Sequence, residues 1–294
     1  MKLLRYGDIG QEKPGILDAD GTIRDLSGHV DDITGATLNA ASLDRIRGID
    51  PASLPAVPAD VRIGACVGGI GKFMCIGLNY SDHAAETGAD IPEHPILFMK
   101  ATSAVVGPND MVMLPRQSRH SDWEVELGVV IGTACKYVSV ENALDHVAGY
   151  FVSNDVSERH FQSKLTGQWT KGKSCDTFGP IGPWLVTADE VPDPQSLGMS
   201  LDVNGVRRQT GNTSTMIFSV AECIAHLSEL MTLHPGDVIS TGTPPGVGMG
   251  IKPEPVFLQE GDVMEVAIDG LGSAAPGGRA GSRLTPENRH GRSS

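Results

Sequence analysis

Three carboxylates near two predicted strands carry the strongest chemical signal in the sequence. Glu124 and Glu126 form a Glu-x-Glu pair within residues 123–131, whose alternating pattern is typical of a β-strand, and Asp155 ends the apolar segment 149–155. Residues two apart on a strand share a face, so the two glutamates point the same way and repel each other. A hard divalent cation such as Mg²⁺ would relieve that repulsion. An ordinary solvated strand face is the alternative.

A histidine and a glutamate three residues apart offer a second kind of chemistry. His83 and Glu86 follow the strand-like segment 73–77, in residues that are predicted to begin a helix. Positions i and i+3 share a helix face, so the carboxylate can orient the imidazole for proton transfer. The pair therefore favours a general base. An exposed pair without a catalytic role is the alternative.

Two lysines and one threonine are further candidates. Lys100 ends the apolar segment 96–100, and Lys173 lies in the segment 171–178. Either lysine could hold an anionic substrate or stabilise an oxyanion, although lysines at strand ends are usually just solvated. Thr243 lies in a Gly/Pro-rich loop whose N–H groups and hydroxyl suit a carboxylate or phosphate, with a plain tight turn as the alternative.

Several familiar catalytic motifs are absent from the sequence. The segment 68–72 imitates a phosphate-binding loop but lacks its first glycine and its Ser/Thr, and neither Gly-x-Ser-x-Gly nor His-Glu-x-x-His occurs. The five cysteines are scattered without a Cys-x-x-Cys motif, which argues against a zinc knuckle or a disulfide framework. Reduced thiols in a cytoplasmic protein are the simplest interpretation.

Length and charge limit the class of protein. A chain of 294 residues suits one large domain, or one large and one small domain. A formal net charge of −13 argues against nucleic acid or an anionic membrane surface as a partner. No apolar run is long enough to span a bilayer, and the N-terminus lacks the apolar core of a secretion signal. We therefore expect a cytoplasmic protein.

The chain divides into a short N-terminal region, a long β-rich region and an aperiodic end. Residues 1–65 contain short strand-like segments, Asp-Gly and Pro-Gly turns and a Pro-rich connector, and they predict a small N-terminal domain. Residues 70–272 combine many short strands with few helices and no regular βαβ repeat, which indicates an α+β, β-rich catalytic domain. Residues 273–294 are rich in Gly, Ser, Arg and Pro, and they predict a disordered tail.

Local patterns predict the individual elements. One helix is predicted near 40–47, another over 140–146 with Ser139 as its N-cap, and a third over 215–231, whose apolar residues recur at helical spacing. The predicted strands are 2–6, 15–18, 22–26, 73–77, 96–100, 125–131, 148–154, 200–204, 237–241 and 263–268.

Taken together, several segments resemble motifs of the fumarylacetoacetate hydrolase family. They occur in the family's order over about residues 72–272 and comprise 77–86, 97–100, 122–127, 149–155, 169–180, 211–218 and 235–244. The chain is most similar to the bacterial branch whose members are named diketo-acid hydrolases, ureidoglycolate lyases or hydroxyheptadienedioate isomerases.

The resemblance implies a fold, a metal site and a catalytic pair. The implied fold is a rolled, mixed β-sheet that holds Mg²⁺, with Mn²⁺ as the other possible ion, in a protein that commonly forms a homodimer. By position in the motifs, Glu124, Glu126 and Asp155 match the metal ligands, and His83 with Glu86 matches the pair that activates water.

The resemblance also assigns the remaining candidates. Lys173 matches the catalytic lysine, whereas Lys100, Gln162 and Thr243 match residues near the substrate. Residues 157–169 match a segment that acts as a lid in relatives. The sequence departs from the pattern after Gly272, where relatives continue a last strand and this chain turns into its aperiodic end.

The implied activity is hydrolysis of a carbon–carbon bond in a small 2,4-diketo acid, either an acylpyruvate or a 2,4-diketo-3-deoxy sugar acid, to pyruvate and a second acid. One alternative is a decarboxylase or an enol/keto isomerase that passes through the same metal-bound enolate of a 2-oxo acid; ureidoglycolate lyase is another. A catalytically silent metal-binding relative is a further alternative, which the intact His83, Glu86 and Lys173 disfavour.

Overall fold

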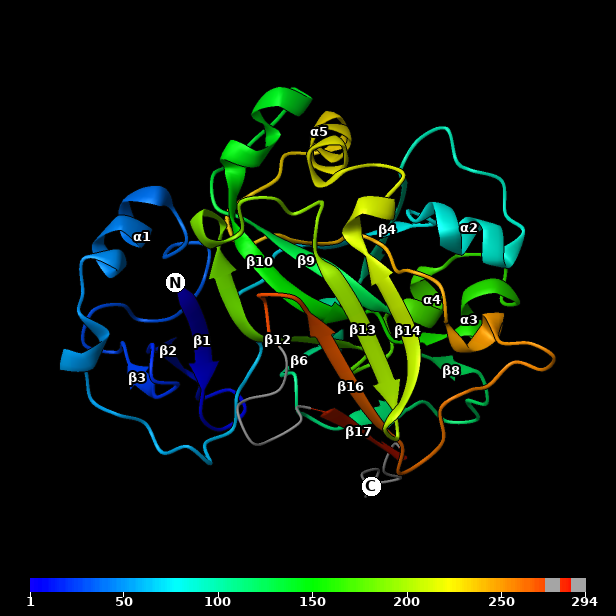
Figure 1. Ribbon diagram of the computed structural model, residues 1–294, viewed down its shortest axis with the longest axis horizontal. Helices are drawn as coiled ribbons and strands as arrows, with labels where there is room; N and C mark the ends of the chain where they lie inside the picture. The colour runs from blue at the N-terminus through cyan, green and yellow to red at the C-terminus, as the bar shows by residue number, and fades with distance from the viewer. Residues whose placement is uncertain (273–280, 287–294) are drawn as a thin grey trace, which may run out of the picture.

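The computed structural model describes residues 1–272 and 281–286, and it contains a ten-stranded sheet, a five-stranded sheet and a two-stranded pair (Figure 1). The ten-stranded sheet runs in the order β3 (Ile23–Asp25), β2 (Lys13–Leu17), β1 (Lys2–Tyr6), β12 (Gly179–Thr187), β10 (Val147–Asn154), β9 (Val125–Ile131), β15 (Val238–Ser240), β4 (Phe73–Gly77) and β5 (Ile96–Lys100), with β6 (Val105–Val106) paired to β12. The five-stranded sheet runs β14 (Val206–Asn212), β13 (Gly198–Val203), β16 (Val263–Ile268), β17 (Gly281–Pro286) and β7 (Val112–Leu114). The two-stranded pair is β11 (Ser157–Glu158) with β8 (Ser121–Asp122).

Short helices lie around these sheets. The α-helices are α1 (Ala40–Arg47), α2 (Ser81–Thr87), α3 (Arg159–Ser163), α4 (Thr170–Lys173) and α5 (Val220–Leu230). The 3₁₀-helices are η1 (Pro51–Ser53), η2 (Thr102–Ala104), η3 (Val140–His146), η4 (Ala188–Glu190), η5 (Thr213–Thr215) and η6 (Gly248–Gly250). Many strands and few helices confirm the prediction of a β-rich α+β fold.

Strand β9 lies between β10 and β15 near the middle of the large sheet and is buried along its whole length. Leu127 and Val129 belong to a core shared with the five-stranded sheet, whereas Val130 belongs to a second core shared with the N-terminal strands. This alternation is the one expected from the sequence. The face of β9 that carries the glutamates is therefore fixed by packing on both sides of the sheet.

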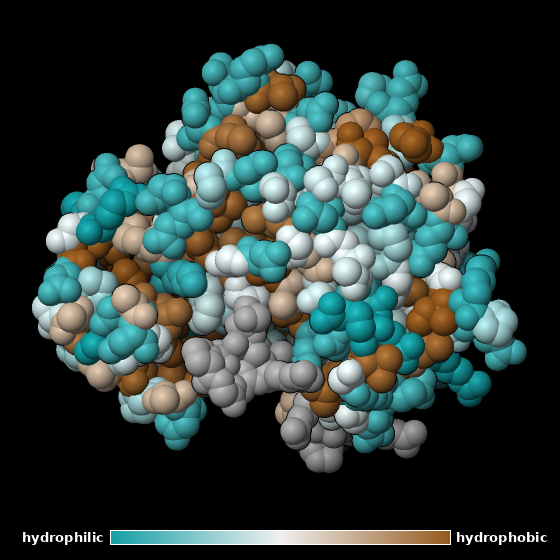
Figure 2. Space-filling model, viewed as in Figure 1, coloured by the Kyte–Doolittle hydropathy of each residue, from teal (hydrophilic) through white to brown (hydrophobic). Residues whose placement is uncertain are grey.

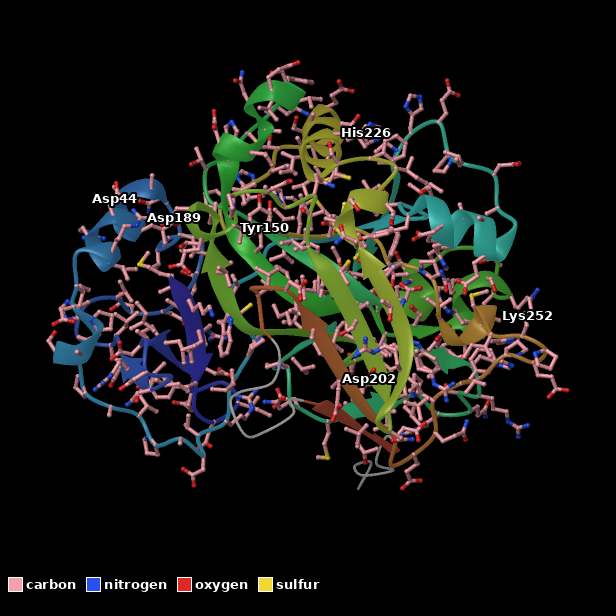
Figure 3. All side chains as sticks on the ribbon, in the orientation of Figure 1. Asp44, Tyr150, Asp189, Asp202, His226 and Lys252 are labelled. Carbon is pink, nitrogen blue, oxygen red and sulfur yellow. The ribbon has the colours of Figure 1, made fainter. Side chains whose placement is uncertain are left out.

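The N-terminal region shares a sheet and a core with the rest of the chain. Strand β1 pairs antiparallel with β12, and Leu3 and Ile16 pack in the same cluster as Phe151. Arg47 of α1 pairs with Asp44 at 2.5 Å and with Asp189 at 3.3 Å, which connects α1 to η4. Figure 3 labels the two aspartates. Residues 1–65 thus extend the large sheet at one edge.

Two predicted helices differ from the structure. Residues 140–146 form a 3₁₀-helix, and the Ser139 side chain makes no capping hydrogen bond. The helix predicted over 215–231 is shorter, because α5 begins after Ser219, which forms a capping box with Glu222. The preceding residues do not continue the α-helix: Thr215 ends η5, and the N–H groups of Ile217 and Phe218 both donate to Asn79. Tertiary hydrogen bonds therefore override the local helical pattern.

The tail predicted over 273–294 is wrong for residues 281–286. These residues form β17, which pairs antiparallel with β16 and parallel with β7. Leu284 is only 3% exposed and belongs to the main core. The segment has weak β-propensity of its own, but the strands on either side offer unpaired backbone groups that fix it. The other residues of the predicted tail lie outside the described residues.

Hydrophilic side chains cover much of the face seen in Figure 2, with hydrophobic residues scattered among them. None of the helices in the described residues is long and apolar enough to cross a membrane.

Candidate active site

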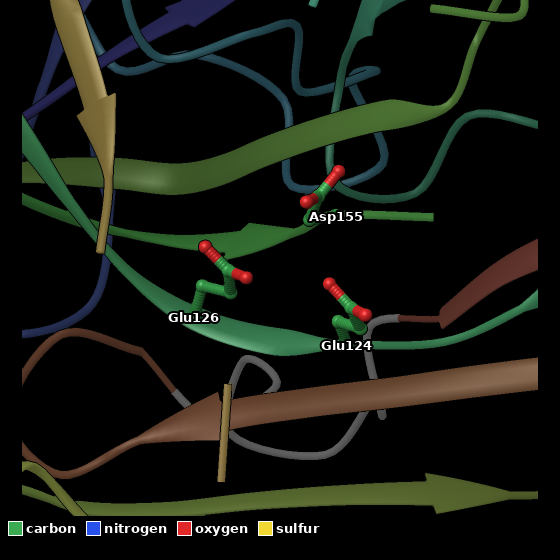
Figure 4. Close-up of side chains that lie close together, drawn as sticks. All are labelled: Glu124, Glu126 and Asp155. Atoms are coloured by element: carbon green, nitrogen blue, oxygen red, sulfur yellow. The ribbon is translucent and has the colours of Figure 1, made fainter. Parts of the chain in front are cut away.

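Three buried carboxylates meet where β9 and β10 pair (Figure 4). Glu126 lies in β9 opposite Ser153, and Asp155 follows β10, where its N–H donates to the Glu124 carbonyl at 2.9 Å. Glu124, Glu126 and Asp155 are 6%, 1% and 0% exposed. One oxygen from each carboxylate lies within 4.8 Å of the others. Antiparallel pairing thus joins the Glu-x-Glu pair and the distant aspartate into one cluster.

The protonation equilibria of the two glutamates are shifted in opposite directions. Burial raises the pKa of Glu126, and the charges of Asp155 and Glu124 raise it further, so it lies well above its usual range. Burial also acts to raise the pKa of Glu124, but Arg159 and Lys173 outweigh this effect and lower it. Glu126 accepts the Gly242 N–H at 2.9 Å, yet it forms no ion pair with any residue that the structure describes.

The donor set fits a hard divalent cation. All three donors are carboxylate oxygens, the ligand type that Mg²⁺ and Mn²⁺ favour over nitrogen and sulfur. A cation among Glu124, Glu126 and Asp155 would offset the repulsion that raises the pKa of Glu126. These are the three residues that the sequence proposes as metal ligands.

Two lysines reach the carboxylates from the protein interior. The Lys173 ammonium lies 2.6 Å from Glu124 Oε2 and 2.6 Å from Asp155 Oδ2. Burial lowers the pKa of Lys173, but Asp155 and Glu124 outweigh this effect and raise it, which keeps the amine charged. Lys100 contacts Asp155 Oδ1 and donates to the Val156 carbonyl at 3.1 Å. The Lys100 side chain is fully buried, and Asp155 is the carboxylate that it contacts.

Arg159 is a site residue that the sequence analysis does not identify. Its guanidinium lies 2.7 Å from Glu124 Oε1 and donates from Nε to Asp122 Oδ2 at 2.8 Å. A third contact, from Nη1 to the Gln162 Oε1 atom, measures 3.1 Å. The available signal is its position four residues after Asp155, where α3 begins.

The His83–Glu86 pair forms as predicted on α2. His83 Nδ1 lies 3.1 Å from Glu86 Oε2. The Gly246 N–H donates to both Glu86 oxygens, at 3.1 and 3.2 Å, and holds the carboxylate in place. If Nδ1 carries the proton that Glu86 accepts, Nε2 is the ring nitrogen that can take a proton from water.

Thr243 and Gln162 are both close to this cluster. The Thr243 hydroxyl donates to the Val125 carbonyl at 2.9 Å and accepts from Gln209 Nε2 at 2.8 Å. Through these two bonds, the hydroxyl holds the loop that carries Thr243 against β9. Gln162 accepts from Arg159, which orients its amide.

A cavity of about 250 Å³ joins most of these groups. Its lining includes His83, Glu124, Glu126, Arg159, Gln162, Lys173 and Thr243, together with apolar side chains. Lys100 is not among the lining residues, in keeping with its position behind Asp155. The structure thus brings the predicted base and two of the predicted metal ligands to one cavity.

Comparison with known proteins identifies the chain's relatives. The family model described as fumarylacetoacetate (FAA) hydrolase, C-terminal, matches residues 72–276. The chain belongs to the fumarylacetoacetate hydrolase family. A relative from Burkholderia ambifaria is 64% identical over 272 residues, which cover 92% of this chain and 96% of that protein. Its name describes it provisionally as a hydrolase.

Two solved family members show the same architecture over nearly the whole chain. Fumarylacetoacetate hydrolase from Exiguobacterium antarcticum is 35% identical with a TM-score of 0.81, and the match covers 98% of this chain and 100% of that one. Maleylpyruvate hydrolase from Sphingobium sp. SYK-6, in complex with manganese(II) and pyruvate, is 30% identical with a TM-score of 0.79 and the same coverage.

In the present chain, residues 157–169 lie between Asp155 and Lys173 along the sequence. Glu158 caps α3 by accepting from the His160 N–H at 3.1 Å. Trp169 packs against Gly77, where an added Cβ would lie only 2.2 Å from the indole. Glycine at this position therefore lets the indole approach β4. Movement of this segment as a lid stays a prediction.

Proposed function

We propose that this chain is a metal-dependent hydrolase that cleaves a carbon–carbon bond of a 2,4-diketo acid and releases pyruvate and a second acid. The observation that carries the proposal is that His83, which is paired with Glu86, lines the same cavity as the carboxylates Glu124 and Glu126. A general base beside an oxygen-ligand cation site suits attack by water on a carbonyl. The family member solved with manganese(II) and pyruvate supports this reaction class.

The base step is assigned to His83. Glu86 accepts a hydrogen bond from Nδ1, which leaves Nε2 to take a proton from water as its oxygen bonds to the distal carbonyl carbon. The bond between that carbon and the methylene group then breaks. Its electron pair stays with the methylene carbon, which takes up a proton to give the methyl group of pyruvate. Water, diketo acid and the two product acids balance.

Charge at the cavity favours an anionic substrate. Glu124, Glu126, Asp155 and Asp122 are four buried carboxylates, and Lys100, Lys173 and Arg159 are three buried cations around them. A bound Mg²⁺ or Mn²⁺ would make the cluster net positive and would supply Lewis acidity to the oxygen atoms of a 2-oxo acid. Lys173 and Arg159 line the cavity, but both already pair with Glu124, so a bound cation would supply most of the positive charge for a substrate oxygen.

The test is a screen of acylpyruvates and 2,4-diketo-3-deoxy sugar acids with Mg²⁺ or Mn²⁺, in which pyruvate and the second acid are both quantified. Equal amounts of the two acids are expected. Full turnover in excess chelator overturns the requirement for a metal. Release of carbon dioxide, or a product that keeps every carbon atom, identifies a decarboxylase or an isomerase in place of the hydrolase.

The variant His83→Ala tests the assignment of the base. We expect a loss of about 10²- to 10⁴-fold in kcat, the usual contribution of a general base. Calorimetric titration with Mn²⁺ should show unchanged affinity, because His83 lies outside the three-carboxylate cluster. Full activity of this variant would favour decarboxylation, which needs no activated water.

A further inference from the structure

The side chains around the active-site cavity are of two sorts. One part of the lining carries the charged and hydrogen-bonding groups described above. The remainder is mainly apolar; apart from Ser163 and two glycines it consists of Ile76, Leu78, Ala89, Phe98, Trp169 and Met249. Phe98 and Trp169 contact each other edge to face, with ring centroids 5.4 Å apart. A substrate whose diketo end lies at the carboxylate cluster would therefore place its other end against hydrocarbon.

Both cations in the lining are already committed to carboxylates. Arg159 is held between Asp122, at 2.8 Å, and Glu124, at 2.7 Å. Lys173 lies 2.6 Å from Glu124 and 2.6 Å from Asp155. Among the described residues that line the cavity, no other lysine or arginine is present. A second carboxylate on the substrate would have no cation to meet it.

We propose that the acyl group of the substrate is short, uncharged and apolar, an alkyl or aryl group with no second carboxylate. This inference rests on the proposed hydrolysis of a 2,4-diketo acid. An unpaired carboxylate loses its hydration when it is buried against apolar side chains, whereas an alkyl group gains from the same burial. The cavity of about 250 Å³ is also small, below the range of roughly 300–1,000 Å³ common for ligand pockets.

Two substrates of matched shape test the proposal. In succinylpyruvate the acyl chain ends in a carboxylate, and in 4-methylpentanoylpyruvate the two oxygens are replaced by methyl groups. We expect kcat/KM to be at least about 100-fold higher for the methyl compound. Equal values, or a preference for succinylpyruvate, overturn the inference and leave the proposed hydrolase intact. Cleavage of neither compound, by protein shown to bind Mn²⁺, overturns the hydrolase proposal and the inference with it.

A pair of variants at Ser163 isolates the effect of charge. Ser163 lines the cavity from the exposed end of α3, and its hydroxyl donates to the Arg159 carbonyl at 2.8 Å. Ser163→Lys and Ser163→Met both lose this bond and add side chains of similar length. We expect only the lysine variant to shift the kcat/KM ratio toward succinylpyruvate, by about 10-fold. An unchanged ratio in the lysine variant overturns the claim that missing positive charge sets the preference.

Discussion

The N-terminal charge network and the carboxylate cluster contain the same kinds of residue but differ in how their charges are balanced. We use the first name for Arg5, Glu12, Asp32, Arg62 and Asp110. In that network each carboxylate lies beside an arginine: Asp32 is 2.7 Å from Arg5, Glu12 is 3.0 Å from Arg62, and Asp110 is 2.6 Å from Arg62. No negative charge in it lacks a partner, which is typical of a structural network.

The carboxylate cluster leaves one charge without such a partner. Glu124 and Asp155 both lie beside cations, but Glu126 forms no ion pair with a described residue and has a raised pKa. The cavity beside the N-terminal charge network is larger than the active-site cavity, at about 410 Å³ against about 250 Å³. In this comparison, a buried carboxylate without an ion-pair partner is therefore a better indicator of a cation site than the volume of a cavity or the number of acidic residues.

Replacing the unpaired carboxylate should have the largest effect. Glu126→Gln removes one of the three proposed oxygen ligands together with the charge that would attract a cation. We expect metal affinity to fall about 100-fold and turnover to fall at least about 10³-fold. Calorimetric titration with Mn²⁺ and a pyruvate-release assay measure the two quantities.

The matched control is Glu12→Gln in the N-terminal charge network. Glu12 lies 3.0 Å from Arg62 and lines the other cavity, so metal affinity and turnover should stay within about twofold of the wild-type values. If the two variants lost metal affinity equally, the distinction between the two groups of charges would fail.

Lys100→Met should have the next largest effect, on stability. The Lys100 ammonium contacts Asp155 inside the protein, and loss of one partner of a buried ion pair costs about 3 kcal/mol. Urea unfolding in chelator should show this loss, and saturating Mg²⁺ should recover part of it by neutralising Asp155. The role near the substrate that the sequence implies for Lys100 predicts a different result, in which KM rises and stability is unchanged.

Arg62→Met should cost less than the lysine variant. Arg62 binds Asp110 at 2.6 Å and Glu12 at 3.0 Å, but its side chain is 24% exposed, so water can hydrate the carboxylates that it leaves. We expect a loss of about 1–2 kcal/mol in the free energy of unfolding. Mg²⁺ should restore none of this loss beyond its effect on the wild-type protein, because the network offers no cation site.

Sequence patterns were sufficient for the groups whose positions depend on local periodicity. Alternation over Glu124 and β9 places Glu124, just before the strand, and Glu126 on one face, and helical spacing on α2 places His83 beside Glu86. The sheet order that brings Asp155 to them was not predicted, because strand pairing is a long-range property; only the family resemblance grouped Asp155 with the glutamates as a ligand.

Residues that act through long-range pairing were missed. Arg159 and Asp122 lie in segments of unremarkable composition, and they meet only because β11 pairs with β8. Lys100 was predicted to lie near the substrate, yet the fold buries it against Asp155, where it does not line the cavity. Strand β17 escaped prediction for the same reason, since neighbouring strands rather than its own residues specify it.

The pH dependence of stability should show the smallest effect, and it tests directly whether Glu126 is the uncompensated charge. Its pKa in the folded protein lies well above the usual value of 4.5, so the folded state holds this proton more tightly than the unfolded state does. The stability from this group is therefore fully present below pH 4.5 and is lost as the pH rises above it. In chelator, the urea midpoint of the wild type should fall relative to that of Glu126→Gln between pH 5 and pH 7.5. Saturating Mg²⁺ favours the ionised carboxylate and should remove the difference in slope. Parallel pH profiles for the two proteins in chelator would mean that the charge of Glu126 is already balanced, as in the N-terminal charge network.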